Sequence, residues 1–195
     1  LHNLQPYSAL DAGTAVDLSD NTSLWGPPPA SVVAVQSLDP NAISRYPQTP
    51  PASFNRLLAS YAGVSIESVV AGCGSDDLLD CCMRTFAEPG DTIAFATPTF
   101  SMIPMFARIN GLRAHTVTFR DDFDIDVDAL LAPSPQIVYL CAPNNPTGTM
   151  LPRATIERVL HEAPGVVLLD EAYGEFAAAH GFELVAKCQR LVVVR

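Results

Sequence analysis

The segment that decides the fold reads VVLLDEAY over residues 166–173. Its four leading apolar residues are typical of a strand that is buried on both faces of a parallel sheet. Asp170 follows directly, where that strand should end. A carboxylate in such a place loses hydration, so we expect it to have a cationic or hydrogen-bonding partner. The chain has no G-x-x-x-x-G-K-[ST] motif to accompany this acid, which excludes a P-loop enzyme.

A second polar motif, PNNPTG, occupies residues 143–148 and follows the mostly apolar segment QIVYLC at 136–141. Its prolines restrict the backbone, while the side-chain amides of Asn144 and Asn145 remain available for hydrogen bonds. Open parallel sheets bind ligands at the carboxyl ends of their strands, so the motif can present an amide to a ligand there. An Asx turn closed by Gly148 explains the motif equally well on its own.

A third motif, GCGSD, spans residues 72–76 and precedes a helical pattern. Glycines allow a sharp turn, and the free N–H groups at a helix start attract an anion such as a phosphate. A tight connection with Ser75 or Asp76 as the N-cap is the structural alternative. A dinucleotide or S-adenosylmethionine site is disfavoured, because the third glycine of G-x-G-x-x-G and a ribose-binding acid are both missing.

Short apolar runs alternate with longer amphipathic ones, which is typical of strand–helix units that build a mainly parallel sheet. Apolar residues that recur three and four apart indicate the helices. We predict strands at residues 68–71, 92–96, 113–119, 136–141, 166–170 and 191–195. We predict helices at residues 53–62, 76–87, 102–110 and 153–162, with a shorter helical pattern at 30–38.

Composition and charge exclude several classes of partner. The 21 acidic and 11 basic residues give a formal charge of −10, the wrong sign for binding a nucleic-acid backbone. Apolar runs are far shorter than the roughly 20 residues of a membrane span, and no export signal is visible from Leu1 onward. We therefore expect a cytoplasmic protein without nucleic-acid or membrane partners. Five cysteines without a C-x-x-C pair predict buried free thiols and no metal site.

In combination and in this order, four motifs resemble those of the class I and II aminotransferases, which use pyridoxal 5'-phosphate. They are GSD at 74–76, PTF at 98–100, NNPTG at 144–148 and DEAY at 170–173. The histidinol-phosphate aminotransferases are the most similar, and RYP at 45–47 has a counterpart there. The resemblance implies a three-layer α/β/α fold with a mainly parallel sheet, like fold type I of these enzymes and incomplete at the C-terminus. Residues 40–195 would form the first part of the cofactor-binding large domain, and residues 1–39 an arm that contacts the small domain or a partner subunit.

The resemblance also implies which residues hold the cofactor's ring. Phe100 would stack on the pyridine ring. Asn145 and Tyr173 would hydrogen-bond the ring hydroxyl. Asp170 would keep the pyridine nitrogen protonated, which lets the ring accept electrons, so that Asp170 and Tyr173 are the expected catalytic residues.

The cofactor's phosphate and the substrate would be held by further residues. The resemblance places Gly74, Ser75 and Asp76 around the phosphate at a helix N-terminus. Tyr46 would reach a phosphate in the neighbouring subunit. Asn21 would contact the substrate, although Thr-Ser-Leu follows it at 22–24 where histidinol-phosphate aminotransferases have Glu-Asn-Pro.

The implied reaction moves an amino group between an amino acid and a 2-oxo acid, in a homodimer. Departures such as residues 22–24, and Asp77 in place of the family's glutamate, leave the substrate open. Histidinol phosphate, another amino acid, or the substrate of a phosphothreonine-type decarboxylase all fit. A non-catalytic domain of the same fold and a Rossmann-type methyltransferase or dehydrogenase are the competing hypotheses.

Lys187 is the only lysine in the chain. It precedes the strand predicted at 191–195, whereas the family's cofactor-binding lysine follows that strand. The two ends of a strand are separated by about 3.3 Å per residue, so we expect Lys187 at the sheet edge opposite Asp170. We therefore expect the chain to be a piece of a longer polypeptide that cannot perform transamination by itself.

Overall fold

The computed structural model describes residues 21–46, 52–177 and 181–195. The chain divides into two compact units, residues 1–50 and 51–195. The described part of the first unit contains the helices α1 (Pro29–Gln36) and α2 (Pro40–Ile43). Each begins with a proline, whose fixed φ suits a first helical turn, where no N–H partner is lost.

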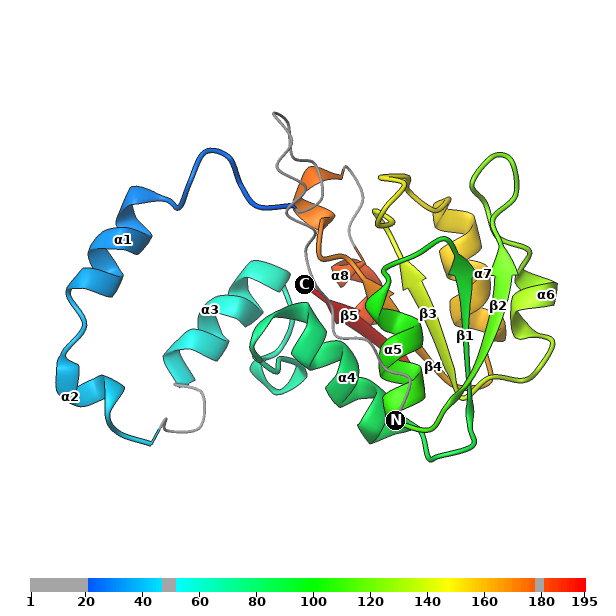
Figure 1. Cartoon of the computed structure of the whole chain (residues 1–195), viewed down its shortest axis with the longest axis horizontal. Coiled ribbons are helices and arrows are strands. Elements are labelled where there is room, and N and C mark those ends of the chain that lie inside the picture. The colour runs from blue at the N-terminus through cyan, green and yellow to red at the C-terminus, as the bar shows by residue number, and fades with distance from the viewer. Residues whose placement is uncertain (1–20, 47–51, 178–180) are drawn as a thin grey trace, which may run out of the picture. The chain divides into compact units, whose positions relative to one another are not determined.

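The second unit alternates strands with helices, as Figure 1 shows. Its strands are β1 (Thr92–Thr97), β2 (Arg113–Thr118), β3 (Ile137–Cys141), β4 (Val166–Asp170) and β5 (Leu191–Val194). Its α-helices are α3 (Ala52–Ala62), α4 (Gly74–Phe86), α5 (Met102–Ile109), α6 (Val127–Leu131), α7 (Arg153–Glu162) and α8 (Phe182–Val185). Two single-turn 3-10 helices are η1 (Ile66–Ser68) and η2 (Gly174–Phe176).

The five strands form one sheet in the order β2-β1-β3-β4-β5, and every neighbouring pair is parallel. The chain passes from β1 to β2 on one side and then returns to β3 on the other side of β1. The carboxyl ends of β1 and β3 therefore lie at a topological switch point, the position where open α/β sheets bind ligands.

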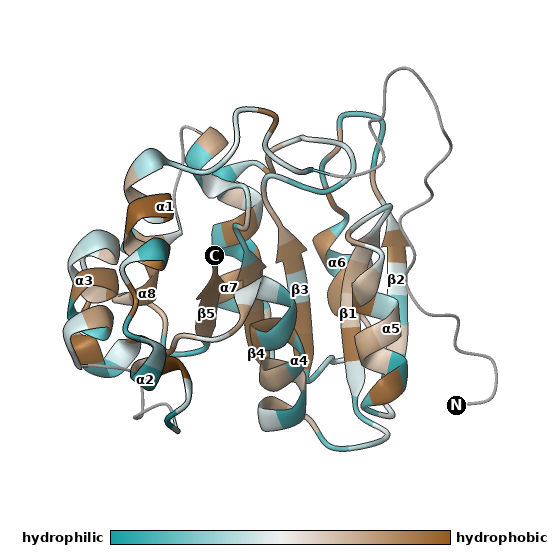
Figure 2. Cartoon of the chain, turned by 60° about the vertical axis from the view of Figure 1, so that its left-hand side comes forward, coloured by the Kyte–Doolittle hydropathy of each residue, from teal (hydrophilic) through white to brown (hydrophobic). Residues whose placement is uncertain are grey.

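Two apolar clusters cover the two faces of the sheet and make three layers. One contains residues of α6, α7 and α8, such as Leu130 and Val159, packed on Leu140 of β3. The other contains residues of α4 and α5, such as Met83, packed on Phe95 of β1. The inner strands β1, β3 and β4 are apolar along most of their length, as Figure 2 shows, whereas the edge strand β2 is largely polar. The predicted three-layer fold with a mainly parallel sheet is confirmed.

The strand predicted at residues 68–71 is wrong. Residues Ile66–Ser68 form η1, and Val69 has an extended backbone but belongs to no strand. A strand needs a neighbour to pair with its backbone N–H and C=O groups, and no described segment pairs with this one. The other five strands and the four longer helices are confirmed to within two residues at each end. No helix in the described ranges has the length and apolar character that a membrane crossing requires.

Candidate active site

A small pocket of about 120 Å³ lies where three strand ends meet the start of α4. The carboxyl ends of β1, β3 and β4 each contribute to it, together with the first turn of the helix. It is lined by Ser75, Asp76, Phe100, Cys141, Asn145, Asp170, Ala172 and Tyr173. Residues from all of the sequence motifs in the second unit, far apart along the chain, are thus brought to one place.

Asp170 is the buried acid of this pocket, with only 3% of its surface exposed. Its Oδ1 accepts a hydrogen bond from the Ala172 backbone N–H at 3.0 Å, and its Oδ2 accepts one from the Tyr139 hydroxyl at 2.6 Å. Burial raises the pKa of Asp170, while these two hydrogen bonds oppose the rise and the nearby charge of Asp76 adds to it. The sequence predicted a cationic or hydrogen-bonding partner for Asp170, and both partners found are uncharged hydrogen-bond donors. A negative charge on the buried Asp170 therefore remains costly.

Only one of the two asparagines after β3 faces the pocket. Asn144 is 2% exposed, and its Nδ2 donates to the Pro98 carbonyl at 3.0 Å and to Thr147 Oγ1 at 2.9 Å. Its Oδ1 accepts from the Thr99 hydroxyl at 2.9 Å. Asn144 therefore ties the loop after β1 to the loop after β3, and Asn145 is left to line the pocket.

The turn at residues 143–148 also has the hydrogen bond of a closed turn. The Gly148 backbone N–H donates to the Asn144 carbonyl at 2.7 Å, and Gly148 has a φ of +68°. That left-handed conformation favours glycine. The sequence left two alternatives for this segment, a closed turn or an amide presented to a ligand. The structure has both, because the turn is closed at Gly148 and Asn145 lines the pocket.

The start of α4 is built by its glycines and not by a side-chain cap from Ser75 or Asp76. Cys73 is the N-cap residue, and Gly74 begins the helix with a φ of +83°. The Cys73 backbone N–H donates to Asp77 Oδ2 at 2.9 Å. The N-cap alternative for Ser75 and Asp76 is therefore wrong, and both residues line the pocket beside the first N–H groups of the helix.

Cys141 and Ala172 line the pocket although no sequence pattern points to them as site residues. Burial raises the pKa of Cys141 to about 11, and the charge of Asp170 contributes to the rise, so the thiol stays protonated and its Sγ–H donates to the Pro143 carbonyl at 3.3 Å. All five cysteines are free, as expected, but the prediction of burial holds only for Cys141, since Cys82 and Cys188 are half-buried and Cys73 and Cys81 are exposed.

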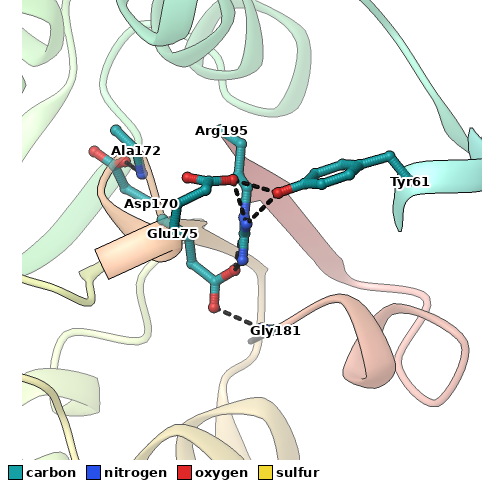
Figure 3. Close-up of polar contacts among 7 residues, drawn as sticks. Tyr61, Asp170, Ala172, Glu175, Gly181 and Arg195 are labelled. Carbon is teal, nitrogen blue, oxygen red and sulfur yellow. Dashed lines mark hydrogen bonds and ion pairs between the residues drawn. The ribbon is translucent and has the colours of Figure 1, made fainter. Parts of the chain in front are cut away.

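A second polar cluster lies beyond the ends of β4 and β5, and Figure 3 shows it beside Asp170. Arg195 pairs with Glu171 at 2.9 Å and with Glu175 at 2.6 Å, and its guanidinium lies 4.2 Å from the centroid of the Phe182 ring. Tyr61 of α3 donates to Glu175 at 2.5 Å. These contacts fix α3 and η2 against the ends of β4 and β5, outside the small pocket.

A larger cavity of about 860 Å³ lies between the end of α3 and α8, and it contains none of the predicted site residues. Its charged lining residues are Arg153 and Glu183, which form an ion pair with each other. The small pocket, with its buried carboxylate at the switch point, is therefore the better candidate for chemistry.

The remaining predicted residues lie elsewhere in the chain. Gly74 precedes the pocket residue Ser75 and shapes the turn. Asn21 and Tyr46 belong to the first unit, and both side chains are exposed. Lys187 lies between α8 and β5, whose first residue Leu191 pairs with Val167 near the start of β4. Lys187 is thus at the amino-terminal edge of the sheet, opposite Asp170, as predicted.

Comparison with known proteins identifies the family. The model of the aminotransferase class I and II family matches residues 14–195. The histidinol-phosphate aminotransferase of Roseiflexus castenholzii is 36% identical over 202 residues, covering 100% of this chain and 54% of that protein. The one from Methanosarcina barkeri is 36% identical over 190 residues, covering 95% of this chain and 52% of that protein. The chain spans about half the length of the curated relatives that it matches.

Solved structures show the same relationship. The histidinol-phosphate aminotransferase of Sinorhizobium meliloti, solved in complex with pyridoxal-5'-phosphate, has a TM-score of 0.68 and 28% identity over 78% of this chain and 43% of its own. Both the sequence matches and the fold therefore lead to one conclusion. This chain belongs to the class I and II aminotransferases.

Proposed function

We propose that the complete protein is a pyridoxal-phosphate-dependent aminotransferase, which moves an amino group between an amino acid and a 2-oxo acid. The observation that carries the proposal is the buried carboxylate of Asp170 in a pocket at the switch point of the sheet. Family membership supports it, and it disfavours the methyltransferase and dehydrogenase alternatives.

The donor set of the pocket fits this cofactor group by group. A protonated pyridine nitrogen would relieve the cost of the buried Asp170 charge, because opposite charges stabilise each other in a dry site. The half-buried ring of Phe100 offers an aromatic face. Asn145 and Tyr173 supply hydrogen-bonding groups for the ring hydroxyl. In this proposal Asp170 and Tyr173 are the catalytic residues.

The start of α4 is the proposed phosphate site. Gly74, Ser75 and Asp76 bring unpaired backbone N–H groups and a hydroxyl to the pocket, and the helix dipole favours an anion there. Tyr46 of a partner subunit would contact the same phosphate, which makes the proposed protein a homodimer. Asn21 is the proposed substrate contact.

When bound, pyridoxal phosphate supplies an electron sink for the bond-breaking step at the substrate's α-carbon. The residues of this chain prepare that chemistry in three ways. Asp170 would hold a proton at the ring nitrogen, Phe100 would stack on the ring, and Asn145 and Tyr173 would hydrogen-bond the ring hydroxyl. The lysine that forms the covalent link would follow β5 in the complete protein, beyond Arg195.

For the amino donor, we propose histidinol phosphate or a similar amine, on the strength of the relatives' names. A cytoplasmic location is the matching expectation. A decarboxylase is the second candidate: the L-threonine-O-3-phosphate decarboxylase of Porphyromonas gingivalis has a TM-score of 0.66 but 20% identity, which reflects the fold alone.

The test is an absorption spectrum of the full-length protein with added pyridoxal phosphate, followed by a panel of amines. We expect a cofactor band that bleaches with histidinol phosphate and returns with 2-oxoglutarate. Release of CO₂ from phosphothreonine instead would make the protein a decarboxylase. A band that no amine bleaches would identify a non-catalytic domain, and the lack of any band would reject the cofactor.

A further inference from the structure

Tyr139 is a buried phenol that none of the sequence motifs includes. It lies in the middle of β3, is 1% exposed, and belongs to the apolar cluster beneath α4 and α5. In the sheet it pairs with Leu168, two residues before Asp170 on the neighbouring strand. Side chains two residues apart share a face of a strand, so the Tyr139 side chain and Asp170 lie on the same face.

The hydroxyl of Tyr139 donates to Asp170 Oδ2 at 2.6 Å, a distance typical of a hydrogen bond from a hydroxyl to a charged carboxylate. The Ala172 backbone N–H holds the other oxygen, Oδ1. A carboxylate has about four lone-pair sites, so these two donors leave acceptor capacity on Asp170 for a group in the pocket. The two hydrogen bonds together fix the rotation of the carboxylate.

The electrostatic surroundings make Tyr139 the donor and Asp170 the acceptor of this hydrogen bond. Burial raises the pKa of Tyr139 far above its ordinary value, and the negative charge of Asp170 adds to the rise, so the phenol donates at every working pH. Burial also raises the pKa of Asp170, and Asp76 of α4 acts in the same sense. Cys141 of β3 is uncharged, and the Tyr139 hydrogen bond is the strongest influence that lowers the pKa of Asp170 and so keeps it ionised.

We propose that Tyr139 is a positioning residue for the aminotransferase reaction, which orients Asp170 and keeps it ionised so that the cofactor's ring nitrogen carries the proton. This inference rests on the proposed function. Tyr139 itself does not line the pocket and does not touch the reacting atoms. It acts through Asp170 alone, because its hydroxyl donates to that carboxylate, and a phenylalanine at this position would keep the ring but lack this donor.

The experiment uses the full-length holoenzyme with pyridoxal phosphate enriched in ¹⁵N. The ¹⁵N chemical shift reports whether the ring nitrogen is protonated, and its pH midpoint is measured for each variant. In Tyr139→Phe we expect the midpoint to fall by about one pH unit and kcat to fall about tenfold, with little change in KM, because one hydrogen bond to a charged group is lost.

Tyr61→Phe is the matched control. It removes a hydroxyl that also donates to a carboxylate, that of Glu175, but outside the pocket. Its ¹⁵N midpoint should equal that of the parent. A second variant, 3,5-difluorotyrosine at position 139, keeps the ring and the hydroxyl and makes the phenol a stronger donor, so the midpoint should rise.

The outcomes separate the two proposals. A parent protein that binds no cofactor overturns the proposed function and the positioning role with it. A parent that binds the cofactor, with an unchanged midpoint in both the Tyr139→Phe and the difluorotyrosine proteins, overturns only the role of Tyr139. If Tyr139→Phe does not fold, the direction of the shift in the difluorotyrosine protein decides.

Discussion

At the scale of single residues, the carboxylate of Asp170 carries most of the proposed chemistry. It is buried, and the hydrogen bonds to it come from the Tyr139 hydroxyl and a backbone N–H. Neither donor neutralises its charge. The site is thus prepared for a cationic guest, and two predictions follow from that charge.

Replacement of Asp170 by alanine in the full-length protein should lower kcat by about a hundredfold or more. A ring nitrogen without its carboxylate loses its proton, and removing one member of a buried ion pair costs about 3–5 kcal/mol. Asp170→Glu should recover little, because an added methylene displaces the charge. Transamination assays with cofactor content measured in parallel provide the test. Turnover within about tenfold of the parent, with cofactor bound, would show that Asp170 does not face the nitrogen.

The raised pKa of Asp170 also gives the stability of the apoprotein a definite pH dependence. An acid with a higher pKa in the folded state binds its proton more tightly when folded, so its contribution to stability is largest at low pH. As the pH rises from the ordinary aspartate pKa of 3.8 to above the raised pKa of Asp170, the parent protein should lose stability relative to the Asp170→Asn variant. Urea unfolding of both proteins at several pH values measures this difference. If the parent instead became more stable relative to Asp170→Asn as the pH rises, the inference that burial raises the pKa of Asp170 would be wrong.

At the scale of elements, the pocket depends on two connections, the turn into α4 and the loop after β3. The first requires the left-handed backbone of Gly74. The second is tied to the loop after β1 by the side chain of Asn144. Each connection can be weakened by one substitution without touching the residues that line the pocket.

Gly74→Ala should destabilise the protein by about 1 kcal/mol, because an L-residue is strained at a φ of +83°. The helix start should also shift, so the dissociation constant of pyridoxal phosphate should rise about tenfold. Gly90→Ala is the matched control, since Gly90 also has a positive φ, +97°, but precedes the start of β1 at the sheet edge opposite the pocket. Urea unfolding and a fluorescence titration compare them. Equal affinities in the two variants would remove the start of α4 from the phosphate site.

Asn144→Ala should cost about 1–3 kcal/mol of stability, because it removes a buried amide and leaves its partly buried partners, Thr99, Thr147 and the Pro98 carbonyl, without their hydrogen bonds. The control is Asn110→Ala, whose amide bonds to Asp80 and to the Phe106 carbonyl at the end of α5. Both variants lose an amide, but only Asn144→Ala should weaken cofactor binding as well. Thermal unfolding and cofactor titration give the two quantities. Unimpaired binding in Asn144→Ala would mean that the two loops hold their positions independently.

At the scale of the whole molecule, the parallel sheet separates its two edges, and this separation places Lys187 away from the pocket. β5 runs parallel to β4, with Leu191 paired to Val167 and Val194 paired to Asp170. The start of β5 is therefore about 10 Å from the edge that carries the pocket. Lys187 precedes that start.

We expect the 195-residue chain to show no turnover and no specific labelling of Lys187 when it is mixed with pyridoxal phosphate and reduced with borohydride. Peptide mass mapping locates any label. The full-length protein is the positive control, and its label should map to a lysine that follows β5. Stoichiometric labelling of Lys187 together with transamination would overturn the proposed arrangement.

The sequence by itself determined five strands and the longer helices, and it pointed to most of the residues that line the pocket, but it did not indicate the short helices α2, α6 and α8. Runs such as residues 166–170 are apolar throughout up to their final acid, and only a strand covered on both faces buries every one of those apolar side chains. Asp170, Asn145 and Ser75 each follow such a run or open a helix, so their position at one sheet edge could be anticipated. The strand expected at 68–71 is wrong, because strand pairing depends on a neighbour that the local sequence does not reveal.

The tertiary structure alone decided which side chains meet. The register of β3 against β4 sets Tyr139 below Asp170 and puts Cys141 in the pocket, and a shift by one residue would have turned both side chains to the other face. In the folded chain, the amide of Asn144 hydrogen-bonds to Thr99 and to the Pro98 carbonyl, so Asn145 and not Asn144 lines the pocket. Local sequence patterns indicate which residues are buried or exposed. Side-chain hydrogen bonds between segments far apart in the sequence, such as Tyr139 to Asp170, depend on how the strands pack, and that packing forms only when the chain folds.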